Sequence, residues 1–108
     1  MIKIATQNSF ATDAMAASNS NLVVVSFHGS MNPDSESLRD LLYELHDSLG
    51  TFDLVTVDVA LHAGIAFRFL ATGLPRTMFL RNEEQAFEML ETVATSEELT
   101  SIINGLVA

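Results

Sequence analysis

Apolar residues concentrate in five short stretches of the chain, and polar or turn-forming residues separate them. Leu22–Phe27 is a nearly continuous run rich in valine, a pattern typical of a strand buried on both faces of a parallel sheet. The remaining stretches are shorter or include polar positions. The sequence therefore predicts five strands, at Ile2–Ala5, Leu22–Phe27, Leu54–Val59, Arg76–Leu80 and Ala86–Val93.

Between the predicted strands, apolar residues recur at the spacing of helices. Ser35–Leu49 is the clearest case, because leucines return every three or four residues and Gly50 is suited to end the helix. Asn8 and Ser9 are suited to cap an alanine-rich helix, and Gly73 is expected to close a later one. The expected helices are Phe10–Ala17, Ser35–Leu49, His62–Leu70 and a last one that follows the Thr95–Glu98 capping box.

The order of these elements is βαβαβαββα, in which Asn82–Glu84 form the turn of a closing hairpin. Alternation of strands and helices over 108 residues predicts one α/β domain, spanning 1–108. We expect a central mixed sheet with helices on both faces.

The net charge limits the kinds of partner that the chain can bind. Fourteen acidic residues against five basic ones give a formal net charge of −9. This charge repels phosphate backbones and anionic lipids, so we expect no nucleic acid and no membrane partner. It would steer a basic protein toward the chain, although it also serves solubility. The hairpin acids Glu83, Glu84, Glu88 and Glu91 are expected to form a solvated face, or alternatively a charge-recognition edge.

The absence of cysteine excludes disulfide scaffolds, thiolate metal sites and cysteine nucleophiles. No Gly-rich phosphate loop and no Ser–His–acid arrangement is visible, so no cofactor is expected. His28, His46 and His62 fall on different elements, so no metal site is expected. Neither a signal peptide nor an apolar run of membrane-spanning length is visible, which predicts a cytoplasmic protein.

Several segments resemble the thioredoxin family in their order and spacing, and the resemblance covers the whole chain. The segments that carry it are Ser9–Asp13, Val24–Phe27, Leu54–Asp58, Thr72–Thr77 and Asn104–Ala108. The resemblance implies a thioredoxin-like fold and a cis peptide bond before Pro75. Arg76 stands between Pro75 and Thr77, which is a small departure from the family pattern.

The active-site motif is the main departure from the family. Where the family has Trp-Cys-Gly-Pro-Cys, this chain has Met31-Asn32-Pro33-Asp34-Ser35. Asn32 takes the place of the attacking cysteine and Ser35 that of the resolving cysteine. An amide cannot attack a disulfide, and a serine needs an adjacent base to act as a nucleophile. We therefore expect Asn32, Asp34 and Ser35 to cap a helix instead.

Two further positions that serve redox chemistry in the family are neutral here. Ser26 stands where the family has a buried acid that assists proton transfer, and Thr56 replaces a basic residue often found beside it. The resemblance thus implies a redox-inactive protein that lacks both active-site cysteines.

With the redox residues missing, the resemblance still implies the family's apolar groove, which binds extended peptide segments. The positions that match this groove are Met31, Asn32, Pro33, Gly73, Leu74, Pro75, Val93 and Ala94. We expect Leu74 to be exposed there. The predicted function is a protein-binding, chaperone or accessory module. The alternatives are a structural or oligomerisation subunit and, less favoured, a non-thiol enzyme that uses a small molecule such as glutathione, with Arg76 as its donor.

Overall fold

The computed structural model describes residues 1–69 and 73–107, so the predicted helix end at Leu70 and the motif residue Thr72 lie outside the described residues. The strands are β1 (Ile2–Ile4), β2 (Val23–His28), β3 (Asp53–Asp58), β4 (Arg76–Arg81) and β5 (Glu84–Leu90). The helical segments are η1 (Ala11–Ala16), η2 (Ala17–Asn19), α1 (Pro33–Leu49), α2 (Ala63–Arg68) and α3 (Ser96–Val107).

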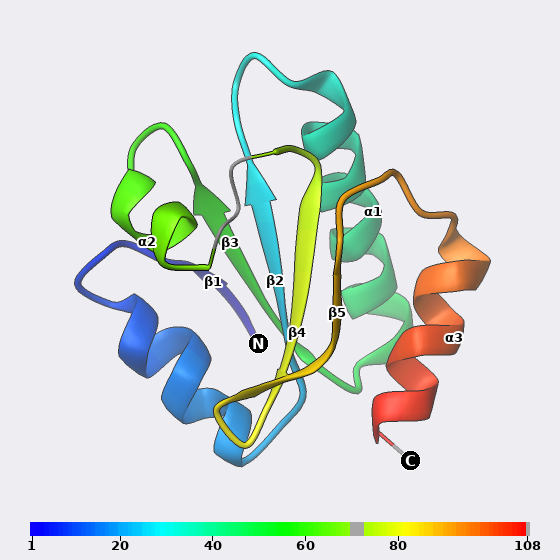
Figure 1. Cartoon of the computed structure of the whole chain (residues 1–108). Helices are drawn as coiled ribbons and strands as arrows, with labels where there is room; N and C mark the ends of the chain where they lie inside the picture. The colour runs from blue at the N-terminus through cyan, green and yellow to red at the C-terminus, as the bar shows by residue number, and fades with distance from the viewer. Residues whose placement is uncertain (70–72, 108) are drawn as a thin grey trace.

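The five strands form one mixed sheet in the order β1-β3-β2-β4-β5 (Figure 1). β3 lies between β1 and β2 and is parallel to both, whereas β4 is antiparallel to β2 and β5. β2 is the central strand, and none of its first five side chains is exposed. The predicted α/β architecture and the predicted element order are confirmed.

Helices cover both faces of the sheet, as expected. Figure 1 shows α1 and α3 on one side and α2 with the blue N-terminal helical segment on the other. Phe27, Val55 and Met78 belong to the core on the η1 and α2 side. Leu42, Phe79 and Ile103 belong to the core on the α1 and α3 side. The alternation of side chains along each strand divides the apolar residues between these two layers.

The first helical segment differs from the expected α-helix. It is a turn of π-helix followed by a 3₁₀ turn, and no side chain caps its start. The Ser9 hydroxyl accepts the backbone N–H of Thr6 at 2.9 Å, so it is taken by the preceding turn. Alanine favours the α-helix, so intrinsic propensity does not account for this winding; the segment packs against the sheet through Phe10 and Ala14.

The ends of the later helices follow local signals with one exception. Gly50 has a φ of 62° at the end of α1, which a glycine adopts without strain. Thr95 and Glu98 exchange hydrogen bonds before α3, which confirms the capping box. α2 ends at Arg68, so Gly73 does not close it. Within the described residues, no helix combines the length and hydropathy needed to cross a bilayer.

Candidate functional site

The loop between β2 and α1 contains Met31 and Asn32, and Asn32 caps the helix that follows. Its Oδ1 accepts the backbone N–H of Ser35 at 2.8 Å, with Asn32 in an extended conformation. Pro33 takes the first helical position, where its missing N–H costs nothing. The cap interpretation of Asn32 is confirmed, and the amide is engaged with the backbone.

Ser35 is fully buried and its hydroxyl serves the loop. Its Oγ accepts the N–H of Gly29 at 3.2 Å and donates to the carbonyl of Asn32 at 2.8 Å. Both hydrogen bonds are made to the backbone, so the hydroxyl proton is committed to a carbonyl oxygen rather than to a base. The Ser35 hydroxyl thus links the end of β2 to the start of α1 through two backbone hydrogen bonds.

We expect Ser35→Ala to lower the free energy of unfolding by about 1–3 kcal/mol, because it leaves the buried Gly29 N–H without its acceptor. Urea denaturation followed by circular dichroism measures this change. The matched control is Ser37→Ala, since Ser37 is exposed on the same helical turn and its loss should have little effect. Equal effects of the two substitutions would contradict the structural role of Ser35.

The segment before β4 packs against this loop. The Leu74–Pro75 peptide bond is cis, as predicted. A Cβ atom added to Gly29 would lie only 3.1 Å from Leu74 Cδ1, so the two segments approach closely at the glycine. The expectation that Leu74 is largely exposed is wrong, because its side chain is half-buried against the core. Pro75 is buried beside it.

The sheet brings the three predicted groove segments to one end. Phe27 at the end of β2 is in register with Arg76 at the start of β4, and Thr77 is in register with Leu90 at the end of β5. Three segments therefore begin or end at neighbouring strand positions, at the top of the molecule in Figure 1. They are the β2–α1 loop, the Leu74–Pro75 segment and the chain after β5.

The side chains of the predicted groove differ widely in exposure. Met31 is 94% exposed and Val93 is 55% exposed. Pro33 and Gly73 are also exposed. Ala94 is only 5% exposed and belongs to the core under α1 and α3, so its methyl group is not available to a partner. Among the residues of the predicted groove, Met31 and Val93 supply most of the exposed apolar surface.

Three residues with buried hydroxyl side chains form a row across adjacent strands of the sheet. Ser26 is in register with Thr56 on β3 and with Thr77 on β4. Ser26 Oγ and Thr77 Oγ1 have no hydrogen-bond partner within the described part of the chain. Burying a neutral hydroxyl costs far less than burying an unpaired carboxylate. Because Ser26 is neutral, its burial without a hydrogen-bond partner is tolerated.

Sequence reasoning missed a polar cluster at the ends of β2 and β3. His28 is in register with Asp58, and Arg39 of α1 reaches His28 Nδ1 at 3.4 Å. Burial and the neighbouring guanidinium hold the pKa of His28 below its ordinary value of 6.5, despite the Asp58 carboxylate. Only the strand register and the docking of α1 bring these residues together. Among the described residues, no group of three His, Asp or Glu side chains could hold a metal ion.

Three other charged residues that the sequence singled out are engaged within the chain, Arg76 and Asp58 at this end of the sheet and Glu83 in the hairpin at the opposite end. Arg76, the donor that the enzyme alternative requires, forms an ion pair with Glu91. The carboxylate of Glu83 accepts from Asn19 Nδ2 at 2.8 Å, so Glu83 joins the hairpin to η2 rather than belonging to a purely solvated face. Asp58 Oδ1 accepts the N–H of Ala60 at 2.9 Å and so stabilises the turn after β3.

Comparison with known proteins identifies the fold of the chain. No family model matches the chain, and no curated protein matches it. An X-ray structure of Fasciola hepatica thioredoxin is similar to it, with a TM-score of 0.82 at 16% sequence identity, over 97% of this chain and 98% of that chain. The chain therefore has the thioredoxin fold and, because it contains no cysteine, no thiol redox chemistry of its own.

Proposed function

We propose that the protein is a redox-inactive protein-binding module, acting as a chaperone or accessory protein. It holds an extended segment of its partner beside the β2–α1 loop and the Leu74–Pro75 segment. The observation that carries this proposal is the 94% exposure of Met31 in that loop. A flexible apolar side chain held in water contributes little to folding but suits adaptable binding.

Two further features support a protein partner. Val93, after β5, adds apolar surface at the same end of the sheet. The net charge of −9 favours association with a basic protein. An extended segment would pair with backbone groups of residues 73–75, in the manner of strand addition. We place this function in the cytoplasm, because a chain without cysteine forms no disulfide and so needs no oxidising environment.

We expect Met31→Asp to weaken binding of the partner by about 2 kcal/mol or more, the range of a hot-spot residue. The substitution puts a charge into an apolar contact, whereas the exposed position should leave the fold intact. Affinity purification from the native source would identify the partner, and calorimetric titration of that purified partner would measure its affinity for the parent and the variant. Leu74→Asp is a poorer test, because its half-buried side chain also stabilises the fold.

The control for this titration is Glu84→Lys, on the exposed hairpin. It should bind as the parent does, and thermal melts should agree for all three proteins. If Met31→Asp binds like the parent while Glu84→Lys loses affinity, the acidic hairpin is the binding surface and the proposed groove is not used.

A further inference from the structure

The outer edge of β1 offers unpaired backbone groups. The Met1 carbonyl accepts the N–H of Leu54 at 2.9 Å, and the Ala5 N–H donates to the Thr56 carbonyl at 2.9 Å. Because backbone groups alternate in direction along a strand, the N–H and C=O groups of Ile2 and Ile4 point away from β3. Within the described residues, no strand pairs with this edge of the sheet.

Apolar side chains flank these backbone groups on the α1 face. Ile4 is in register with Thr56, whose side chain faces α1, and Ile4 is 75% exposed. Leu61, in the loop after β3, is 72% exposed. Ile4, Leu61 and Tyr43 line one cavity of about 410 Å³. An apolar side chain of an added strand could therefore enter this cavity between β1 and α1.

The polar wall of the same cavity carries a surplus of negative charge. Asp40, Asp58, Arg39 and His28 line it. The guanidinium of Arg39 is already held by Asp40 Oδ1 at 3.2 Å. Burial and Arg39 lower the pKa of His28 and so favour its uncharged form. Asp40 and Asp58 each keep an Oδ2 that makes no hydrogen bond within the described part of the chain. This wall would therefore attract a cation.

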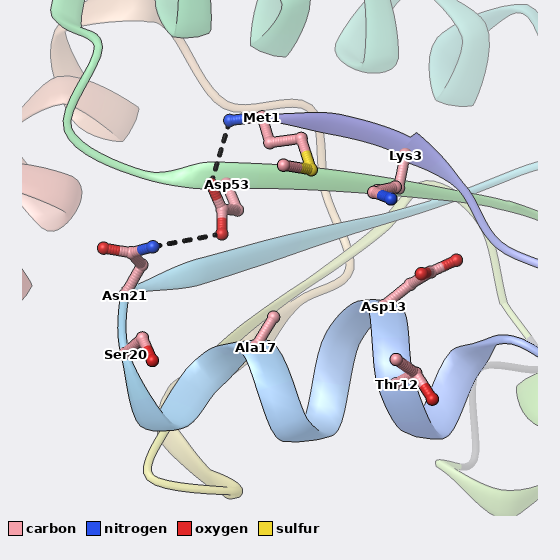
Figure 2. A pocket seen from close by; sticks show the side chains of 8 residues that line it. All are labelled: Met1, Lys3, Thr12, Asp13, Ala17, Ser20, Asn21 and Asp53. Atoms are coloured by element: carbon pink, nitrogen blue, oxygen red, sulfur yellow. Dashed lines mark hydrogen bonds and ion pairs between the residues drawn. The ribbon is translucent and has the colours of Figure 1, made fainter.

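The occupant of this edge is not expected to be a second copy of the chain. Two copies with a charge of −9 each would repel one another. Lys3, which discourages strand pairing at an edge, lies on the opposite face, where it lines a separate pocket with Thr12 and Asp13 of η1 (Figure 2). The α1 face of β1 is left without this protection.

The other edge of the sheet is less suited to strand addition. The pairing of β4 with β5 shifts register on both sides of Phe79. Irregularities of this kind twist an edge strand and discourage further pairing. The pairing of β1 with β3 has no such shift.

We propose that the β1 edge is a second binding surface, separate from the groove beside Pro75, which takes an extended basic segment of another protein. The segment adds a strand to β1 through the backbone of Ile2 and Ile4. One aliphatic side chain enters the cavity between Ile4 and Leu61, and a lysine or arginine two residues away on the same face approaches Asp40 and Asp58.

The probe for this surface is the blocked hexapeptide Lys-Thr-Leu-Thr-Lys-Thr, which carries both lysines and the leucine on one face when extended. Titration into the ¹⁵N-labelled protein should shift the amide signals of residues 2–5 and 58–61, and added salt should weaken the binding. Ile4→Ser and Asp40→Asn should each weaken it, the former by about tenfold, as expected for loss of an apolar anchor. Val93→Ser, at the groove, should change nothing.

Two altered peptides complete the test. Replacing both lysines by glutamate should abolish binding, and replacing the leucine by serine should weaken it by removing the aliphatic side chain that enters the cavity. The proposal is overturned if the hexapeptide fails to bind, if the signals that shift belong to β5, or if Val93→Ser weakens binding as much as Ile4→Ser. A dimer whose formation is prevented by Ile4→Ser would also overturn it, because the edge would then belong to a second copy.

Discussion

Replacing Asn32 and Ser35 by cysteine is expected to create disulfide reductase activity that the parent chain lacks altogether. Asn32 caps α1 and Ser35 lies in its first turn, so both thiols would stand at the positive end of a helix. Such a position lowers a thiol pKa below the free value of about 8.5 and so favours the thiolate that attacks disulfides. The Ser35 hydroxyl is buried, which would keep the second thiol within the loop.

The rate of this variant should nevertheless be limited, because Ser26 stands where the resemblance to thioredoxins implies an acid that assists proton transfer. Insulin turbidity with dithiothreitol measures the activity. The parent should match the blank without protein, and the double variant Asn32→Cys, Ser35→Cys should accelerate precipitation.

A single-cysteine control shows whether the activity depends on positions 32 and 35 or only on the presence of a thiol. Ser101→Cys places one exposed thiol on α3, away from the loop, and should leave the insulin assay at the blank rate. Acceleration by the parent, or by Ser101→Cys as much as by the double variant, would contradict the assignment of these two positions.

Phe79→Ala is expected to lower the free energy of unfolding by about 3–5 kcal/mol, the range for removing a buried aromatic side chain. Phe79 is fully buried on β4 beneath α1 and α3, and its ring meets Phe87 edge-on with centroids 5.8 Å apart. Domains of this size are stable by only about 5–15 kcal/mol, so the loss is a large share of the whole.

Urea denaturation measures the effect, and Phe67→Ala is the matched control. Phe67 is 75% exposed on α2, so the same chemical change there should alter stability by less than about 0.5 kcal/mol. A loss below about 1 kcal/mol for Phe79→Ala would contradict the close packing of this core, because such packing leaves a cavity when a ring is removed.

The groove and the β1 edge lead to different expectations for a partner. Met31 and Val93 offer apolar surface, whereas the cavity beside Ile4 combines apolar and acidic groups. A partner that uses both surfaces would lose affinity with Met31→Asp and with Ile4→Ser. A partner that uses one surface would respond to only one of these variants, so the two proposals can fail separately.

Local patterns in the sequence determined most of the elements. The valine-rich run at β2 predicts a buried strand because continuous apolar residues need cover on both faces. Gly50 and the Thr95–Glu98 box mark helix ends through interactions that span only a few residues. The lack of cysteine excludes thiol chemistry directly from composition. The resemblance to thioredoxins implied the cis bond before Pro75.

Only the tertiary structure decided which side chains meet across the sheet and how far each is exposed. Leu74 is half-buried because Gly29, distant in sequence, leaves room for it. His28 meets Arg39 and Asp58 because α1 docks over two strands in a particular register. Ala94 lies in the core while Val93 beside it is exposed. These outcomes depend on contacts between distant segments, and such contacts leave no periodic signal in the sequence.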